Sequence, residues 1–99
     1  MNKKDYQTNM KYIAKMYKEN KKEIEENKNT IASYKLDSNV EFVEHIDLFL
    51  SLMPYEIERI IRKDFLEDRQ VKWWLEHYSK STYYRRKEEA IELFVDCLS

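Results

Sequence analysis

Apolar residues in the first third of the chain recur with the seven-residue spacing of a coiled coil. Two interleaved series carry the repeat: Met10, Tyr17, Ile24 and Ile31 in one register, and Tyr6, Ile13, Asn20, Asn27 and Tyr34 in the other. The pattern predicts a long helix from Asp5 to about Tyr34. Because two asparagines lie in the seam, this helix would be marginal in isolation. It is therefore expected either to pack on its own domain or to pair with a second copy as a homodimer.

A second helix is predicted where the apolar period resumes after residues 35–39. Ser38, followed three residues later by Glu41, has the spacing of a capping box and would start it. The apolar residues that follow occupy more than one stripe, as expected of a core helix buried on several sides. They are Val40, Phe42, Val43, Ile46, Leu48, Phe49, Leu50 and Leu52.

Two further apolar stripes predict a third and a fourth helix. Pro54 fits the first turn of the third helix, where its missing N–H is not needed, and the buried stripe is Ile57, Ile60, Ile61 and Phe65. After a polar connection at 67–70, a short fourth helix is indicated by Val71, Trp74, Leu75 and Tyr78. Trp74 is expected in the core. Trp73 is expected to support the next helix, to join a partner surface or to remain half exposed.

The last helix is predicted to begin at Ser79, whose hydroxyl can accept a hydrogen bond from a backbone N–H of the first turn. Its apolar face consists of Tyr83, Lys87 by its stem, Ala90, Ile91, Phe94 and Leu98, and its polar face of Lys80, Ser81, Thr82, Tyr84 and Arg85. Helix-turn-helix proteins use such an arrangement to place a second helix in the major groove of DNA. An ordinary amphipathic helix with a basic first half would show the same pattern.

The run Tyr-Ser-Lys-Ser-Thr-Tyr-Tyr-Arg-Arg-Lys at 78–87, with Glu-Ala-Ile after it, resembles the recognition helix of ArpU-type phage late-transcription regulators. Those proteins are similar in turn to region 4 of bacterial sigma factors. The resemblance covers roughly Leu52 to Phe94 and implies a small transcription regulator with a helix-turn-helix at about 70–95. Its recognition helix would be about Ser79–Phe94. By position, the residues facing DNA would be Lys80, Ser81, Thr82, Tyr84 and Arg85, with Tyr83 facing inward.

Two positions depart from the pattern of these families. His77 stands where the motif usually has Gly, and Trp73 stands where it has a small Ala. The bulk of Trp73 should alter how the two helices approach. His77 is expected to accept the backbone geometry of the turn, because His is among the non-glycine residues found more often at positive φ.

Further basic residues are candidates for contacts with DNA phosphates, which add affinity without reading sequence. They are Arg59, Arg62, Arg86 and Lys87. For the third helix an alternative remains open, in which Arg59, Arg62 and Lys63 pair with Glu58 or Glu67 on the protein surface.

Composition and charge narrow the fold and the class of partner. The chain has 99 residues with no Gly and one Pro, which excludes most hairpin-rich β folds and predicts an all-α protein of four to five helices. The expected division is a long N-terminal helix at 1–35 and a helical domain at 36–99. The net charge is −1, but nine Lys or Arg face six acids in residues 54–87, whereas residues 36–53 and 88–99 each carry four acids and no Lys or Arg. Any DNA binding must therefore use local charge.

The sequence gives little support to catalysis, a cofactor or a metal. It has no Gly-rich phosphate loop, no HExxH and no Cys–His pairing with an orienting group, and His45 has no second His or Cys at ligand spacing. Cys97 is the single cysteine, and no signal peptide or long apolar run is visible, so a cytoplasmic location is expected. The abundance of Lys, Asn, Ile and Tyr is compatible with an A+T-rich bacterial or phage genome.

Two functions follow as hypotheses of different classes. The first is a DNA-binding transcription regulator that acts on double-stranded DNA. The second is a helical protein-interaction module that binds a larger assembly such as RNA polymerase without touching DNA.

Overall fold

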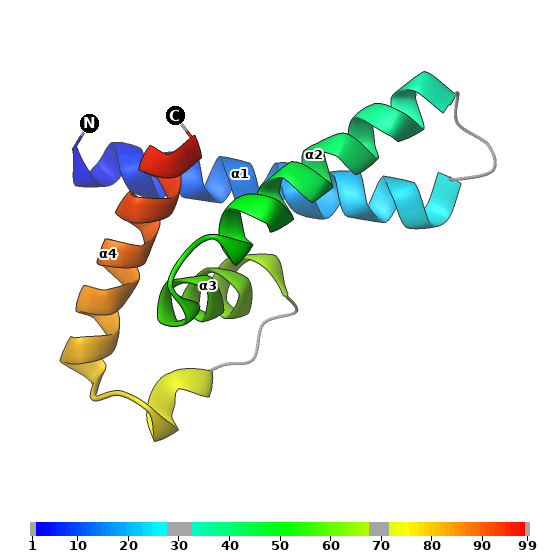
Figure 1. The fold of residues 1–99 in the computed structure, drawn as a ribbon. Coiled ribbons are helices and arrows are strands. Elements are labelled where there is room, and N and C mark those ends of the chain that lie inside the picture. The colour runs from blue at the N-terminus through cyan, green and yellow to red at the C-terminus, as the bar shows by residue number, and fades with distance from the viewer. Residues whose placement is uncertain (1, 28–32, 68–71, 99) are drawn as a thin grey trace.

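The computed structural model describes residues 2–27, 33–67 and 72–98. Four α-helices make up most of this part: α1 (Lys3–Asn27), α2 (Ser33–Ser51), α3 (Tyr55–Ile61) and α4 (Lys80–Leu98) (Figure 1). A π-helix, η1 (Arg62–Leu66), continues α3, and a single 3-10 turn, η2 (Trp73–Glu76), precedes α4. The described residues contain no strand, so the all-α prediction is confirmed.

One stripe of α1 holds the N-terminal helix to the domain. Asn2 caps the helix, since its Oδ1 accepts a hydrogen bond from the Asp5 N–H at 3.0 Å. Met10, Ala14 and Tyr17 follow at helical spacing and are buried in the core that the four helices share. Over this stripe the helix packs on its own domain, the first of the two predicted arrangements. Pairing of two copies through the rest of α1 stays a prediction.

The boundary between the first two helices differs from the predicted one. α1 ends at Asn27, Ile31 lies outside the described residues, and α2 already begins at Ser33. The capping box predicted at Ser38 and Glu41 is wrong, because both residues lie inside α2 and are exposed. The predicted division at 35/36 also falls within this helix. No Gly or Pro stops a helix in this segment, so the break in the apolar period reflects polar positions within α2, of which Asp37 and Ser38 are exposed and Asn39 is buried.

α2 buries one stripe rather than several. Ile46 and Leu50 are buried, and the residues packed beside them are Phe42, Val43 and Phe49. Leu48 is exposed, and Leu52, just beyond the end of the helix, is 68% exposed. The prediction of a helix buried on several sides is therefore wrong for these two leucines.

The π-helix at the end of α3 sets the direction of the residues that meet α4. Pro54 directly precedes α3, and Ile60 and Ile61 are buried as predicted. The Glu67 N–H donates to the Arg62 carbonyl oxygen at 2.8 Å, five residues back, which is the wider turn of a π-helix. This turn brings Asp64 and Phe65 to α4, where both contact Lys87.

A polar network beside the core ties together α1, α2 and η1. The Tyr17 hydroxyl donates to Asp47 Oδ1 at 2.8 Å, and Arg62 Nη1 donates to the same oxygen at 3.2 Å. Arg62 Nε also donates to Glu58 Oε2 at 3.1 Å. Burial, together with the hydrogen bond to Asp47, raises the pKa of Tyr17. The stability linked to this phenol is therefore fully present below the pKa of an unfolded tyrosine and is lost as pH rises through the raised pKa.

α4 crosses the first half of α1, so the two ends of the chain lie at the same end of the molecule (Figure 1). Four residues of α4, Ala90, Ile91, Phe94 and Val95, are buried against the other helices. At the crossing the Tyr6 hydroxyl donates to Asp96 Oδ1 at 2.8 Å, and Lys3 forms an ion pair with Glu88. The apolar face predicted for the last helix is confirmed at Tyr83, Ala90, Ile91 and Phe94.

The first prediction tests whether α1 is part of the domain core. Met10→Ala removes a side chain with no exposed surface and should lower the free energy of unfolding by about 2–5 kcal/mol. The matched control is Tyr12→Ala on the same helix, because Tyr12 is 64% exposed and should change stability by no more than about 0.5 kcal/mol. Urea denaturation followed by circular dichroism measures both. Equal stability of the two variants would show that α1 does not pack on the domain.

Candidate nucleic-acid interface

The segment before α4 is a 3-10 turn, which is wound more tightly than the α-helix that begins a helix-turn-helix motif. Residues 68–71, including Val71 of the predicted fourth helix, lie outside the described part, and Trp73–Glu76 forms one 3-10 turn. The prediction of a short α-helix is therefore wrong for its described residues, and Leu75 of its stripe is exposed.

The left-handed residue of this segment is Lys72 rather than His77. Lys72 has φ 59° and ψ 33°, whereas His77 has φ −113°. His77 accepts the backbone geometry of the turn, as expected, but without a positive φ. Because a side chain at Cβ disfavours the left-handed region, Lys72 carries a steric cost of about 1–2 kcal/mol. The sharp turn thus comes before the short helix, and the chain reaches α4 through ordinary backbone.

Tyr83 anchors the first half of α4 and is only 3% exposed. Trp74 stacks on its ring with centroids 4.4 Å apart and planes 7° apart, and Trp73 meets it edge-on at 6.2 Å. Asp64 accepts hydrogen bonds from the Tyr83 hydroxyl and, at 2.7 Å, from Trp73 Nε1. Lys87 Nζ lies 3.6 Å from Asp64 Oδ2. The inward position that the family resemblance implies for Tyr83 agrees with this burial.

Trp73 supports α4, one of the three roles expected of it, whereas Trp74 does not take its expected place in the core. Trp73 packs partly against the hydrophobic core, so its bulk fills the space between η1 and α4. Trp74 was expected in the core but covers Tyr83 from the outside and lines a surface groove. The 3-10 turn explains why Trp74 is not in the core, because its three-residue period turns Trp73 inward where a 3.6-residue period would favour Trp74.

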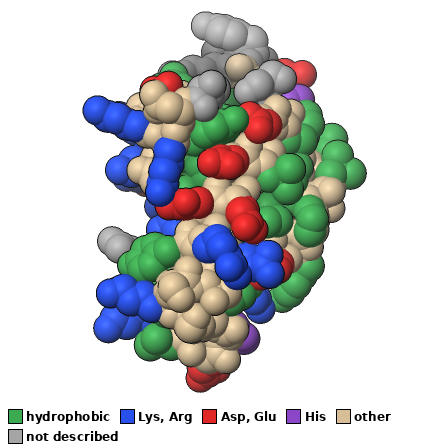
Figure 2. Space-filling model, turned by 90° about the vertical axis from the view of Figure 1, so that its left-hand side faces the viewer, with side chains coloured by type: hydrophobic (Ala, Val, Ile, Leu, Met, Phe, Trp, Pro, Cys, Tyr) green, Lys and Arg blue, Asp and Glu red, His purple; other side chains and the backbone are tan. Residues whose placement is uncertain are grey.

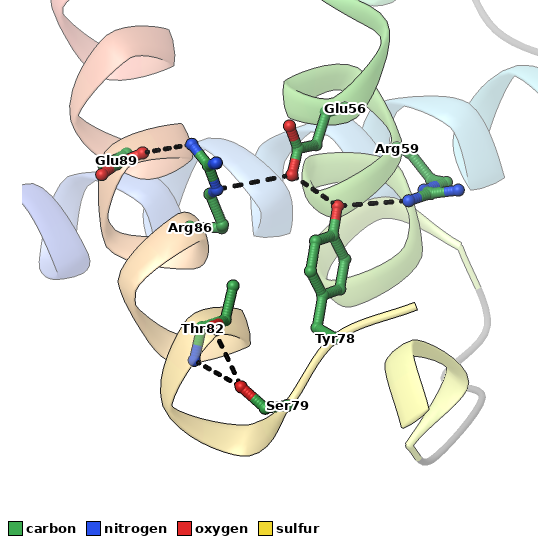
Figure 3. A network of polar contacts seen from close by, with 7 residues as sticks. All are labelled: Glu56, Arg59, Tyr78, Ser79, Thr82, Arg86 and Glu89. Carbon is green, nitrogen blue, oxygen red and sulfur yellow. Dashed lines mark hydrogen bonds and ion pairs between the residues drawn. The ribbon is translucent and has the colours of Figure 1, made fainter. Parts of the chain in front are cut away.

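A second contact joins η2 and α4 to α3 through Tyr78 (Figure 3). The Tyr78 hydroxyl donates to Glu56 Oε1 at 2.7 Å and accepts from Arg59 Nη2 at 3.2 Å. Arg86 Nε lies 3.6 Å from the same Glu56 oxygen, and Arg86 Nη1 donates to Glu89 at 3.4 Å. Burial and the hydrogen bond to Glu56 raise the pKa of Tyr78, so its phenol remains a donor at neutral pH.

Of the nine predicted DNA-binding residues, four have cationic groups that form ion pairs or lie over aromatic rings of the protein. They are Arg59, Arg62, Arg86 and Lys87. The Arg59 guanidinium lies 5.4 Å from the Trp73 ring and 5.5 Å from the Tyr55 ring. Arg62 pairs with Glu58 and Asp47, and Lys63 pairs with Glu67. For Arg62 and Lys63 the structure thus agrees with the alternative of surface ion pairs.

The other five predicted residues lie in the first turns of α4. Ser79 caps the helix as predicted, since its Oγ accepts from the Thr82 N–H at 3.3 Å and donates to Thr82 Oγ1 at 2.9 Å (Figure 3). Thr82 is therefore half-buried at the cap, whereas Lys80, Ser81, Tyr84 and Arg85 are exposed. Within the described part of the chain, neither Lys80 nor Arg85 has an ion-pair partner.

A groove of about 1060 Å³ runs between α1 and the segment from Lys72 to Lys87. Its basic lining comes from both sides: Lys11, Lys15 and Lys18 on α1, and Lys72, Lys80 and Lys87 opposite. Sequence reasoning missed the three lysines of α1. Their spacing of four and then three residues places them on one face of the helix, but nothing in the sequence indicated which segment that face would meet.

Other kinds of site find no support in the described residues. No group of three or more His, Cys, Asp and Glu side chains there is arranged to hold a metal ion. In the same ranges, every helix is too short or too polar to cross a membrane.

The second prediction tests whether Asp64 positions the first half of α4. Asp64→Ala removes the acceptor of Trp73 and Tyr83 and leaves Lys87 without its carboxylate, so unfolding free energy should fall by about 1–3 kcal/mol. Glu67→Ala is the control, because Glu67 is half exposed and, among the described residues, pairs only with Lys63, and it should cost at most about 0.5 kcal/mol. Urea denaturation and near-ultraviolet circular dichroism of the tryptophans measure the effect. An Asp64 variant as stable as the Glu67 variant would remove Asp64 from this role.

No family model, curated protein or solved structure matches this chain. The resemblance of residues 78–91 to a recognition helix therefore stays a prediction, and the arguments for function come from the geometry of α4 and the surfaces around it.

Proposed function

We propose that the protein is a DNA-binding transcription regulator in which the first half of α4 enters the major groove of double-stranded DNA. The observation that carries this proposal is the exposure of Lys80, Ser81, Tyr84 and Arg85 on a helix whose opposite face is fixed by Tyr83. A helix can read base edges only if its backbone is held still while these side chains stay free. Both conditions are met in the first two turns of α4.

The charge distribution along α4 supports an anionic partner at its N-terminal half. Basic residues occupy that half, namely Lys80, Arg85, Arg86 and Lys87, and acids occupy the other, namely Glu88, Glu89, Glu92 and Asp96. This order opposes the helix dipole, whose positive end lies at the N-terminus, so it weakens the isolated helix. DNA phosphates near the N-terminal half would offset that repulsion.

Fewer residues are proposed to contact DNA than the nine predicted from the sequence. Arg85 is the best candidate for base reading, because guanidinium groups bridge the two acceptors of guanine and Arg85 has no ion pair in the described part of the chain. Ser81 and Tyr84 lie on the same exposed side. Lys80, beside the cap, is placed for a phosphate. Arg59 and Arg62 stabilise the fold through their contacts within the protein and are left out of the proposed DNA contacts. A regulator of this kind would work in the cytoplasm of a bacterium or of a phage-infected cell.

The third prediction separates base reading from phosphate attraction. Selection on randomised duplexes by the intact chain should enrich a sequence, and Arg85→Ala should weaken binding to it by about 1–3 kcal/mol at one base position. Lys80→Ala should weaken binding to all duplexes alike and flatten the dependence of log K on log salt by about one unit. Fluorescence anisotropy over a salt series measures both effects.

The matched control for these variants is Lys21→Ala, which removes one exposed charge from α1 outside the groove. All three variants should keep the helical circular dichroism of the parent. Recovery of no enriched sequence, together with equal binding by Arg85→Ala and Lys21→Ala, would reject the reading of bases by α4.

A second candidate function rests on an apolar patch away from α4. Leu48, Leu52 and Tyr55, at the end of α2 and the start of α3, are each more than half exposed. The leucines are four residues apart, the spacing by which a helix presents anchors to a partner. This patch favours a protein-interaction module that binds a larger assembly such as RNA polymerase without DNA contact.

The fourth prediction tests that alternative with purified bacterial RNA polymerase. If the patch is the contact, the double variant Leu48→Ser, Leu52→Ser should reduce capture of the polymerase at least tenfold in biolayer interferometry. Leu93→Ser, at an exposed leucine of α4, should leave capture unchanged. Absence of capture by the intact chain, or equal loss in both variants, would reject the patch as a polymerase site.

A further inference from the structure

We infer that the groove between α1 and the Lys72–Lys87 segment binds a single strand of nucleic acid, a ligand distinct from the duplex assigned to the exposed face of α4. The two walls of this groove differ in kind. α1 supplies a row of lysines, and the opposite wall supplies aromatic rings among further lysines. Proteins that bind single strands combine these two features, a basic track for the backbone and rings on which bases stack.

The charge of the groove contrasts with that of the chain. Six lysines and two acids line it, a formal balance of +4, in a protein whose net charge is −1. One of the acids, Asp64, is already paired with Lys87, and Glu67 with Lys63. Within the described residues no carboxylate pairs with Lys11, Lys18, Lys72 or Lys80. On the face in Figure 2, Lys and Arg side chains project along the left edge, and others lie near the middle beside a group of Asp and Glu side chains.

The aromatic wall offers rings that the fold covers only in part, although Tyr84 also contacts Trp74 and Tyr83. Trp74 is stacked on Tyr83, which covers one face of the indole, and the half-buried Trp74 also lines the groove. Tyr84 is 50% exposed and lines the same space. A base laid against Trp74 would extend the Trp74–Tyr83 stack by one ring, and the lysines of α1 would then face the backbone of that strand.

The shape of the groove favours a strand over a duplex. Bases inside a duplex are stacked on each other and cannot lie on Trp74, whereas unpaired bases can. The space continues beside α4 into a smaller hollow of about 220 Å³, which shares Lys11, Phe65, Tyr84 and Lys87 with the main groove. This continuity gives a chain-like ligand a path along α1, instead of the closed pocket that suits a small molecule.

The experiment measures binding of fluorescein-labelled oligodeoxythymidylate to the full chain by anisotropy over a salt series. The parent should bind, and the double variant Lys11→Gln, Lys18→Gln should flatten the slope of log K against log salt by about 1.4, since each phosphate contact to a single strand contributes about 0.7. Trp74→Ala should weaken binding about 5- to 150-fold through lost stacking. Tyr84→Ala, at an exposed ring, gives a second test of stacking if Trp74→Ala does not fold.

Matched controls lie on the same helix as the lysine row but outside the groove. Lys4→Gln, Lys21→Gln removes the same charge from exposed positions of α1, and Tyr12→Ala removes an exposed ring. Neither should change binding beyond the loss expected from net charge. The inference is overturned if the parent does not bind the oligonucleotide at low salt. It is also overturned if the control pair flattens the slope as much as Lys11→Gln, Lys18→Gln, or if both ring variants bind like the parent.

Lys80 and Tyr84 belong to both surfaces, so this inference is kept separate from the proposed function by variants at residues that only one surface contains. Arg85 does not line the groove, so Arg85→Ala should weaken duplex binding and leave strand binding unchanged. The Lys11, Lys18 pair should behave in the opposite way. Loss of strand and duplex binding in parallel in the lysine variant would overturn the assignment of a separate strand site. Failure of the parent to bind duplex, with strand binding retained, would reject only the duplex proposal.

Discussion

The buried carboxylate of Asp64 fixes the relation between α3 and the first half of α4. It lies on the π-helix, 12% exposed, and receives two hydrogen bonds and one ion pair from three different residues. An isolated carboxylate at such a site would be costly to desolvate, so its partners must be present together. These hydrogen bonds fix the side-chain conformations of Trp73 and Tyr83. Because Trp74 stacks on the Tyr83 ring, the position of Trp74 is fixed as well. The exposed side of α4 is oriented as a consequence.

This arrangement divides the basic residues of the C-terminal half into two groups. Arg59, Arg86 and Lys87 neutralise acids or lie over aromatic rings, and their charges hold the helices together. Lys80 and Arg85 belong to the second group and remain solvent-facing. Basic residues that count equally toward the net charge therefore differ in whether their side chains can contact a ligand. The number of Lys and Arg side chains that the folded surface offers to a ligand is therefore smaller than the number counted in the sequence.

The sequence was sufficient to predict the helices in which the apolar stripe and the residues that start or end a helix indicate the same boundaries. Ser79, with an apolar face after it, predicted the start and inner side of α4, and Ile60 and Ile61 predicted the buried side of α3. Prediction failed where the backbone leaves the α-helical period. Neither the π-helix at Arg62–Leu66 nor the 3-10 turn at Trp73–Glu76 has a pattern that a 3.6-residue period detects, so Trp74 was wrongly expected in the core. The lysine row of α1 was visible as spacing, but the groove it lines depends on packing between segments more than fifty residues apart.

The contact between the two ends of the chain has a consequence for synthesis on the ribosome. Tyr6 and Asp96, ninety positions apart, are joined by a hydrogen bond where α4 crosses α1. α1 leaves the exit tunnel before α4, so its packing is completed only after α4 has been made. Until α4 emerges, α2 and η1 can contact α1, but the partner of Tyr6 on α4, Asp96, is still absent. Its lysine-rich outer side would keep the nascent segment hydrated during that interval, so the same charges that line the finished groove would also protect the unfinished chain from premature association.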